Sequence, residues 1–247
     1  MKYLKVGCIV ALCFAIYLNR AYAHMYSTIG SSSLVRPIMQ NPVTLFPDTS
    51  STNHMTYVAL GDSLTAGVGA SREEHTFAYL LAARLANKKN ATVTLVNLGE
   101  PGATTADVLN RQVPRAVELH PDVLTLVIGV NDIHNRVPIV EFQNSIRAIV
   151  DSLVPVATRI YVTTIPYIGS KQTFLPPYRE YIDWQTRRYT TALRVALQNR
   201  PVTLIDLYTE THERAWHDAS YYALDGFHPS DIGYNFWSTI LYDRLDY

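Results

Sequence analysis

The chain has 247 residues, with 21 Lys and Arg against 21 Asp and Glu, and 48% of its residues are hydrophobic. This balance excludes a multi-span membrane protein and an intrinsically disordered chain. The composition also lacks the basic excess that binding to nucleic acid phosphates requires, so we expect no nucleic acid partner.

The first residues have the organisation of a secretory signal peptide. Lys2 and Lys5 precede an apolar run over residues 6–18, and Ala21-Tyr22-Ala23 supplies the small residues that signal peptidase recognises. The run is shorter than the roughly 18 residues that a membrane span needs, which disfavours the alternative of an uncleaved anchor. We expect cleavage near Ala23, no integral span in the mature chain, and a secreted or periplasmic protein.

Both cysteines, Cys8 and Cys13, lie inside this predicted signal peptide. Disulfides are common in exported proteins, but the chain that remains after cleavage has no cysteine to form one. Its stability must therefore come from a hydrophobic core.

Residues 24–55 differ in composition from the rest of the chain. Among these 32 residues, 15 are Ser, Thr, Asn or Pro, and no apolar periodicity is sustained. Such a segment is typical of a flexible leader. The remaining residues, 56–247, have the length of one domain.

Short apolar runs recur in this domain, and they are nearly continuous rather than alternating. Strands with this pattern are covered on both faces, as in a parallel sheet between two layers of helices. The runs cover residues 57–60, 93–98, 123–130, 160–165 and 202–207, and the intervals between them leave room for crossover helices. The sequence therefore predicts a three-layer α/β/α sandwich with a five-stranded parallel sheet.

Two of the helices have clear apolar faces. One is predicted over residues 139–153, with Pro138 at its start. The last helix is predicted to begin after a capping Ser230. Its apolar face consists of Ile232, Phe236, Trp237, Ile240, Leu241 and Leu245.

Polar residues suited to acyl transfer follow these strands, at the sheet edge where open α/β proteins place their sites. Ser63 follows the first strand, and Asp225 and His228 follow the fifth. A serine nucleophile needs a base such as histidine, and the histidine needs a carboxylate that holds its tautomer. Gly102 and Asn131, which follow the second and third strands, are candidates for stabilising an oxyanion together with the amide of Ser63.

These residues form four blocks that resemble those of the SGNH, or GDSL, family of esterases and lipases. The blocks are Gly61-Asp62-Ser63-Leu64, Gly102, Gly129-x-Asn131-Asp132 and Asp225-x-x-His228, in the family's order. The resemblance implies a flavodoxin-like fold and a triad of Ser63, Asp225 and His228. It also implies an oxyanion hole made by Ser63, Gly102 and Asn131.

The same resemblance implies hydrolysis of carboxylic esters without a metal or organic cofactor. The implied substrates are small-molecule or lipid esters, namely fatty acyl esters, lysophospholipids or thioesters, and we expect a monomer. One alternative is a carbohydrate O-acetyl esterase that uses the same site. Another is an exported binding protein whose site is blocked by residues 169–179. The amino-acid composition does not favour any one of these functions over the others.

Overall fold

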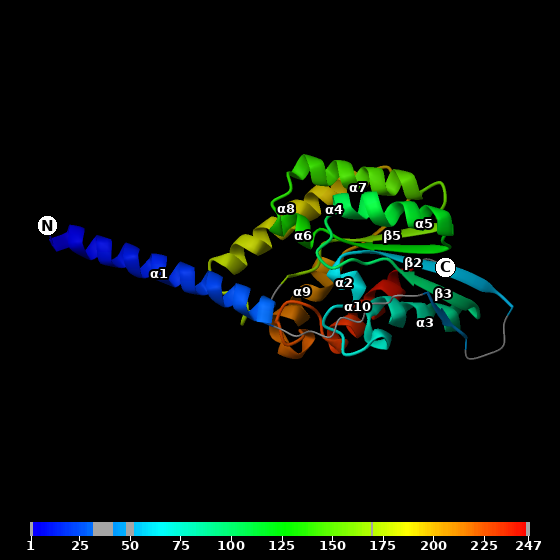
Figure 1. Ribbon diagram of the computed structural model, residues 1–247, viewed down its shortest axis with the longest axis horizontal. Helices are drawn as coiled ribbons and strands as arrows, with labels where there is room; N and C mark the ends of the chain where they lie inside the picture. The colour runs from blue at the N-terminus through cyan, green and yellow to red at the C-terminus, as the bar shows by residue number, and fades with distance from the viewer. Residues whose placement is uncertain (1, 32–41, 48–51, 169, 246–247) are drawn as a thin grey trace.

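The computed structural model describes residues 2–31, 42–47, 52–168 and 170–245 (Figure 1). Its strands are β1 (Val43–Leu45), β2 (His54–Gly61), β3 (Thr92–Asn97), β4 (Val123–Val127), β5 (Arg159–Thr163) and β6 (Thr203–Ile205). Its α-helices are α1 (Lys2–Ser31), α2 (Ser63–Ala66), α3 (Phe77–Lys89), α4 (Thr105–Asp107), α5 (Val113–Leu119), α6 (Val130–His134), α7 (Ile139–Leu153), α8 (Tyr178–Leu197), α9 (Leu207–His217) and α10 (Asp231–Arg244). Three short helices of other types are η1 (Glu73–His75), η2 (Val108–Gln112) and η3 (Ala219–Tyr221).

The described strands form one sheet in the order β1-β3-β2-β4-β5-β6. All five predicted strands are present, and they pair in parallel. If the five parallel strands β2 to β6 are numbered 1 to 5 along the chain, their order across the sheet is 2-1-3-4-5. This is the strand order of flavodoxin-like folds. This order reverses beside β2, so the crevice for a ligand is expected at the carboxyl end of that strand.

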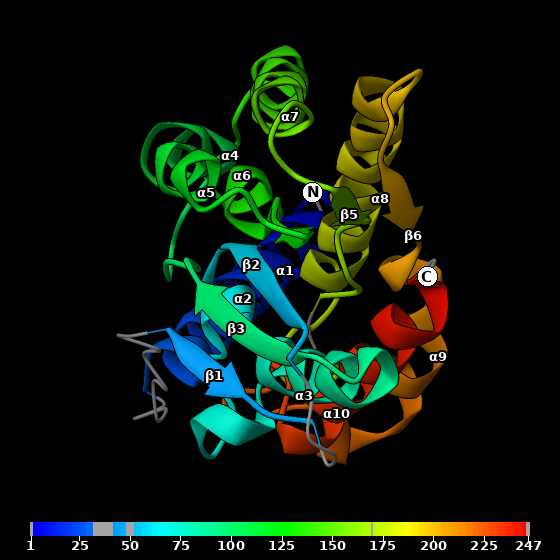
Figure 2. The same ribbon diagram turned by 90° about the vertical axis from the view of Figure 1, so that its right-hand side faces the viewer.

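Helices cover both faces of the sheet, which confirms the three-layer sandwich. Figure 2 shows α3, α9 and α10 on one side of the sheet, with α5, α7 and α8 on the other. The strands between these layers are the centre of the core, and every residue of β4 is buried. Continuous apolar runs are found in these strands because neither face of the sheet meets water.

The two helices with predicted apolar faces are α7 and α10. Phe142, Ile146 and Leu153 of α7 are fully buried, as the pattern predicts. Ser230 caps α10 by accepting hydrogen bonds from the backbone N–H groups of Ile232 and Gly233. The prediction for Ile232 is wrong, because its side chain is 44% exposed in the first turn of α10.

The sheet has an additional strand that the sequence pattern did not predict. β1 pairs antiparallel with β3, with Val43 opposite Leu95, so the sheet is mixed rather than wholly parallel. β1 lies inside residues 24–55, and this part of the predicted flexible leader is ordered by its pairing with β3. Residues 32–41 and 48–51 of the leader lie outside the described residues.

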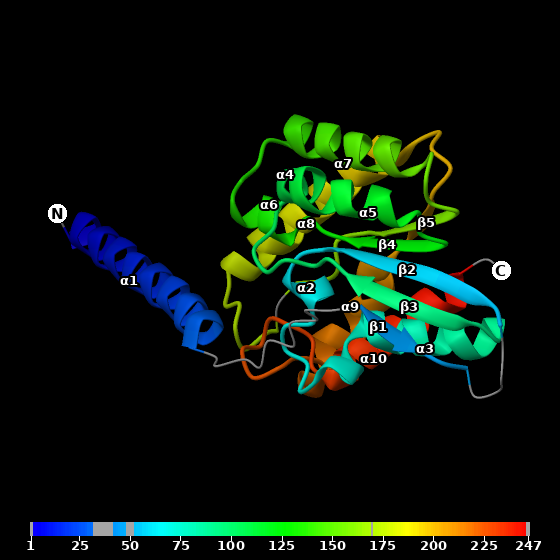
Figure 3. The same ribbon diagram turned by 45° about the vertical axis from the view of Figure 1, so that its right-hand side comes forward.

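The helix α1 extends away from the domain (Figures 1 and 3). It contains a stretch, Val6–Met25, that is long and apolar enough to cross a membrane, so the predicted shortness of the apolar run is wrong. Signal sequences near the N-terminus share this property. The C-terminal part of α1 contacts the segment before α8. There Tyr17 donates a hydrogen bond to the backbone oxygen of Pro176 at 2.8 Å.

Candidate active site

Ser63 begins α2, directly after β2 (Figure 3). The turn between them requires glycine at position 61, where φ is +150° and an added Cβ would lie 2.1 Å from the backbone oxygen of Val127. The buried side chain of Gln112 pairs with both backbone groups of Gly61, accepting from its N–H at 2.9 Å and donating to its oxygen at 2.8 Å. Gly61 and Gln112 thus fix the backbone that presents Ser63.

Asp62 and Asn97 hold the short helix α2 in place. The buried carboxylate of Asp62 caps the helix by accepting a hydrogen bond from the N–H of Leu64 at 2.9 Å. The side chain of Asn97, at the end of β3, donates to the backbone oxygen of Thr65 at 2.7 Å. A helix of four residues has too little internal hydrogen bonding to be stable alone, so these contacts supply its rigidity.

Ser63, His228 and Asp225 form a continuous chain of hydrogen bonds. The Ser63 Oγ lies 3.0 Å from His228 Nε2, and His228 Nδ1 lies 2.6 Å from Asp225 Oδ2. Asp225 is fully buried, and its Oδ1 accepts hydrogen bonds from the N–H groups of Phe227 and His228. The imidazole is therefore held between the hydroxyl and a carboxylate that cannot turn away, an arrangement suited to proton transfer.

Asn131 and Gly102 lie at the same edge of the sheet. The Asn131 Nδ2 donates to the backbone oxygen of Ala103 at 3.0 Å, and it lies 3.5 Å from Asp62 Oδ2. Asn131 therefore connects the neighbour of Gly102 with the neighbour of Ser63. Gly102 is exposed with φ at +85°, a conformation that side chains disfavour.

The residue after Asn131 anchors this arrangement. Asp132 is fully buried and accepts hydrogen bonds from the N–H and the hydroxyl of Thr105, at the start of α4. This contact ties α6, which follows β4, to the start of α4, which follows β3. The candidate oxyanion donors Asn131 and Gly102 are thereby kept in a fixed relation.

The pKa of Asp62 is strongly shifted. Burial raises it from 3.8 to about 7, the hydrogen bond from Leu64 opposes the rise, and the carboxylate of Asp132 adds to it. Burial also raises the pKa of Asp132. Two buried carboxylates at one edge of the sheet disfavour each other's ionisation.

This shift makes the stability of the protein depend on pH. The unfolded chain ionises Asp62 near pH 4, whereas the folded chain keeps its proton until about pH 7. Between these values the folded state binds more protons, so the free energy of unfolding falls as the pH rises. The Asp62→Asn variant has no carboxyl group at this position, so its free energy of unfolding should not fall in this way. Between pH 4 and pH 8 the free energy of unfolding of the variant should rise by a few kcal/mol relative to that of wild type.

Urea unfolding of both proteins at a series of pH values measures this difference. Asparagine keeps the capping function, so the helix α2 should be retained. The exposed Asp243→Asn change on α10 is the control, and its free energy of unfolding should depend on pH as that of wild type does. The same pH dependence in Asp62→Asn and wild type would contradict the prediction.

Sequence reasoning identified Ser63, Asp225 and His228 but missed the residues that position them. Gln112 and Asn97 carry no local motif, because each acts on a segment far along the chain. Their only signal in the sequence is a polar residue within or beside an apolar segment. Among the residues that the structure describes, no group of three or more His, Cys, Asp or Glu could hold a metal ion.

Solved structures that are similar to the chain in fold include two lipases and an acetylxylan esterase. A lipase from a goat rumen metagenome is 20% identical, with a TM-score of 0.63 over 77% of this chain and 97% of that one. The lipase/acylhydrolase from Enterococcus faecalis is 21% identical, with a TM-score of 0.63 over 76% and 94%. An acetylxylan esterase from Geobacillus stearothermophilus is 19% identical, with a TM-score of 0.61 over 78% and 94%.

The sequence itself is matched by a family model. None of the curated proteins is similar enough in sequence to count as a match. The model of the GDSL-like Lipase/Acylhydrolase family matches residues 59–236, which contain Ser63, Gly102, Asn131 and the Asp225/His228 pair. The chain therefore belongs to the GDSL-like Lipase/Acylhydrolase family and is an ester-hydrolysing serine hydrolase.

Proposed function

We propose that this enzyme hydrolyses carboxylic esters through an acyl-enzyme formed on Ser63. The observation that carries the proposal is the hydrogen-bonded chain from Ser63 through His228 to the buried Asp225. A serine hydroxyl is a weak nucleophile at neutral pH, and an oriented imidazole within hydrogen-bonding distance is what activates it.

In this mechanism the Ser63 Oγ attacks the ester carbonyl while His228 Nε2 accepts its proton. His228 then donates that proton to the leaving alcohol as the ester C–O bond breaks. A water molecule enters, gives a proton to His228 and attacks the acyl-enzyme, which releases the acid and restores Ser63. Asp225 holds the Nδ1 proton of the imidazole throughout and stabilises its charged form.

The oxyanion that forms at each attack needs donors that are already in place. We assign this role to the backbone N–H groups of Ser63 and Gly102 and to the side chain of Asn131. The contacts of the Asn131 amide with the Ala103 oxygen at 3.0 Å and with Asp62 Oδ2 at 3.5 Å support the assignment, because they orient the amide at the sheet edge beside Ser63. All of these groups belong to one chain, so we propose an active monomer.

The space beside Ser63 favours a small substrate group. A pocket lined by Leu64, Tyr167 and Phe227 has a cavity volume of only about 10 Å³, close to the space that one water molecule needs. A fatty acyl chain does not fit such a pocket. This observation favours short esters, including the O-acetyl esters of carbohydrates, over fatty acyl esters, lysophospholipids and long-chain thioesters.

We further propose that α1 is an export signal cleaved after Ala23. Apolar side chains along it lie open to water, with Ile9, Val10 and Leu12 each more than 60% exposed. Such a surface is unfavourable in solution and suits the passage of a signal peptide through a membrane. The enzyme would then act in the periplasm or outside the cell.

Labelling with a fluorophosphonate tests the nucleophile. The full chain is expressed in an exporting host, the exported protein is treated with the probe, and its peptides are weighed. We expect the adduct on Ser63 and none in the Ser63→Ala variant. Labelling elsewhere would contradict the mechanism and indicate another nucleophile. No labelling in a folded sample would favour the blocked binding protein. The same peptides identify the N-terminal residue, which is His24 if α1 is cleaved as proposed.

A further inference from the structure

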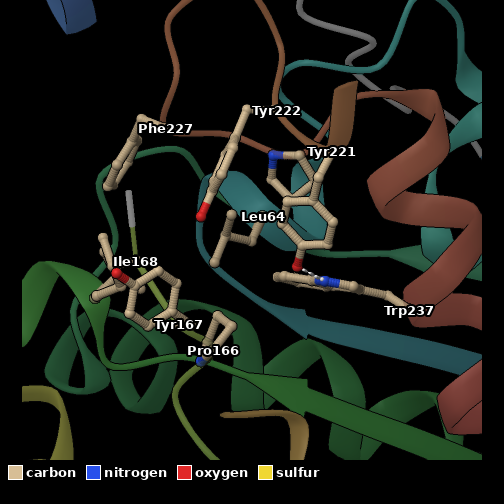
Figure 4. Close-up of a pocket in the computed structure, with 10 residues that line it drawn as sticks. Leu64, Pro166, Tyr167, Ile168, Tyr221, Tyr222, Phe227 and Trp237 are labelled. Carbon is tan, nitrogen blue, oxygen red and sulfur yellow. Dashed lines mark hydrogen bonds between the residues drawn. The ribbon is translucent and has the colours of Figure 1, made fainter. Parts of the chain in front are cut away.

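The pocket beside Ser63 contains a polar group that the mechanism does not use. Figure 4 shows the pocket walls, which come from α2, from the segment after β5, from the loop before α10 and from α10 itself. Most of the lining side chains are apolar or aromatic: Leu64, Val130, Pro166, Ile168, Phe227, Pro229 and Trp237. The others are the tyrosines Tyr167, Tyr221 and Tyr222.

This pocket lies next to the reacting groups. Three of its lining residues are direct chain neighbours of residues in the proposed mechanism: Leu64 follows Ser63, Val130 precedes Asn131, and Phe227 precedes His228. The ring of Phe227 lies 4.8 Å from that of His228, edge to face. The reacting groups do not line the pocket themselves, but the contact between Phe227 and His228 brings it within reach of a group next to the ester carbonyl at Ser63.

The hydroxyl of Tyr222 is buried and has no hydrogen-bond partner among the described residues. The residue is 7% exposed, and Figure 4 shows its hydroxyl end directed toward the space between Leu64 and Ile168. Its neighbour Tyr221 differs, because the Tyr221 hydroxyl accepts a hydrogen bond from Trp237. An unpaired buried hydroxyl is costly, and native structures pair nearly all such groups.

The backbone holds Tyr222 in a fixed position relative to His228. Tyr222 forms an antiparallel bridge with Pro229, and the N–H of Ala223 donates to the backbone oxygen of His228 at 2.8 Å. The loop that carries Asp225 and His228 is closed by these contacts. The distance from the Tyr222 hydroxyl to the catalytic groups is thus set by a rigid loop.

The chemistry of the hydroxyl is that of a neutral donor. Burial raises the pKa of Tyr222 far above its usual value, so the group keeps its proton at any pH at which the enzyme works. The opposite wall is also rigid, since the ring of Tyr167 packs edge to face on His212 at 4.7 Å. The pocket therefore combines largely apolar walls with the buried, unpaired hydroxyl of Tyr222.

We propose that Tyr222 is a specificity-determining residue whose hydroxyl donates a hydrogen bond to a hydroxyl group on the substrate. The preferred substrates are then short esters that carry a hydroxyl close to the ester bond, on the alcohol part or on the acyl part. This inference rests on the proposed function of Ser63. An apolar group in the pocket would leave the Tyr222 hydroxyl unpaired, which is how a buried polar group rejects the wrong substrate.

Two matched pairs of esters distinguish the two sources of the hydroxyl. Glycerol monoacetate against propyl acetate changes the alcohol part, and ethyl 2-hydroxypropanoate against ethyl propanoate changes the acyl part. In one of the two pairs, the kcat/KM of the wild-type enzyme should be about tenfold higher for the hydroxylated ester. A good neutral hydrogen bond contributes a free energy that corresponds to a ratio of this size. The pair that shows the preference identifies the part of the substrate that enters the pocket.

The Tyr222→Phe variant keeps the ring and removes only the hydroxyl. The preference in kcat/KM should fall to near one, and the melting temperature should stay equal or rise because an unpaired buried group is gone. The matched control is Tyr242→Phe at the end of α10, where the tyrosine ring lies beside Arg84 and Lys88. This control should keep the wild-type preference.

The outcomes separate this inference from the proposed function. If wild type shows no preference in either pair, or if Tyr222→Phe keeps it, Tyr222 does not select the substrate and the inference is overturned. A lower melting temperature with an equal loss on both esters of a pair would assign Tyr222 a structural role, which also overturns it. Turnover that persists in Ser63→Ala would instead defeat the proposed function.

Discussion

The Ser63→Ala variant should fold normally and lose its esterase activity, with kcat lower by roughly a million-fold, as for other enzymes deprived of a serine nucleophile. The loss is this large because no other group occupies the position 3.0 Å from His228 Nε2 that the Ser63 Oγ holds. Alanine fits the first turn of α2, whose cap is the side chain of Asp62 rather than Ser63. The measurement is the rate of acetate release from a short acetyl ester.

The matched control is Ser152→Ala on the exposed surface of α7. It removes the same hydroxyl from a place without a partner in the mechanism, so its rate should equal that of wild type. Thermal unfolding of both variants checks that the fold is intact. Substantial turnover by a folded Ser63→Ala protein would mean that the nucleophile is another group.

The Asp225→Asn variant should lower kcat by about four orders of magnitude while leaving the fold in place. Asp225 Oδ1 accepts two backbone N–H groups, so the asparagine oxygen should stay there and its amino group should face His228 Nδ1. The imidazole must then place its proton on Nε2. In that tautomer it cannot accept the proton of Ser63, although the distances hardly change.

A pH series distinguishes this cause from simple loss of the site. At high pH hydroxide can assist the attack, so the deficit of Asp225→Asn relative to wild type should shrink. Asp243→Asn, an exposed change of the same kind on α10, should behave as wild type. An Asp225→Asn enzyme with a normal rate near pH 7 would show that the carboxylate does not set the tautomer.

The five parallel strands and the residues of the site were predictable from sequence for a local reason. Each parallel strand contains an apolar run, and Ser63 and Asn131 follow their strands within a few residues, which places them at one edge of the sheet. His228 comes after β6, α9 and η3, and its motif with Asp225 is what identified it. A strand that is buried on both faces is apolar along its own sequence, so it can be predicted without knowing which strand it pairs with.

The remaining features depend on partners that are distant in the chain. Val43–Leu45 becomes a strand because β3 supplies its hydrogen bonds, and nothing within its own polar segment indicates this. Gln112 acts on Gly61, and its two contacts arise only after β2 and η2 are packed. Tyr222 is one of 17 tyrosines, and only its burial without a partner distinguishes it.

The strand β1 also bears on how copies of this protein avoid sticking to one another. Without it, β3 would present a row of free N–H and C=O groups along the side of the sheet, and its Thr92–Asn97 sequence is rich in residues that favour strands. Such an open edge invites a second chain to add itself and to begin aggregation. β1 covers this edge with only three residues, so the new edge it exposes is too short to serve as an effective template.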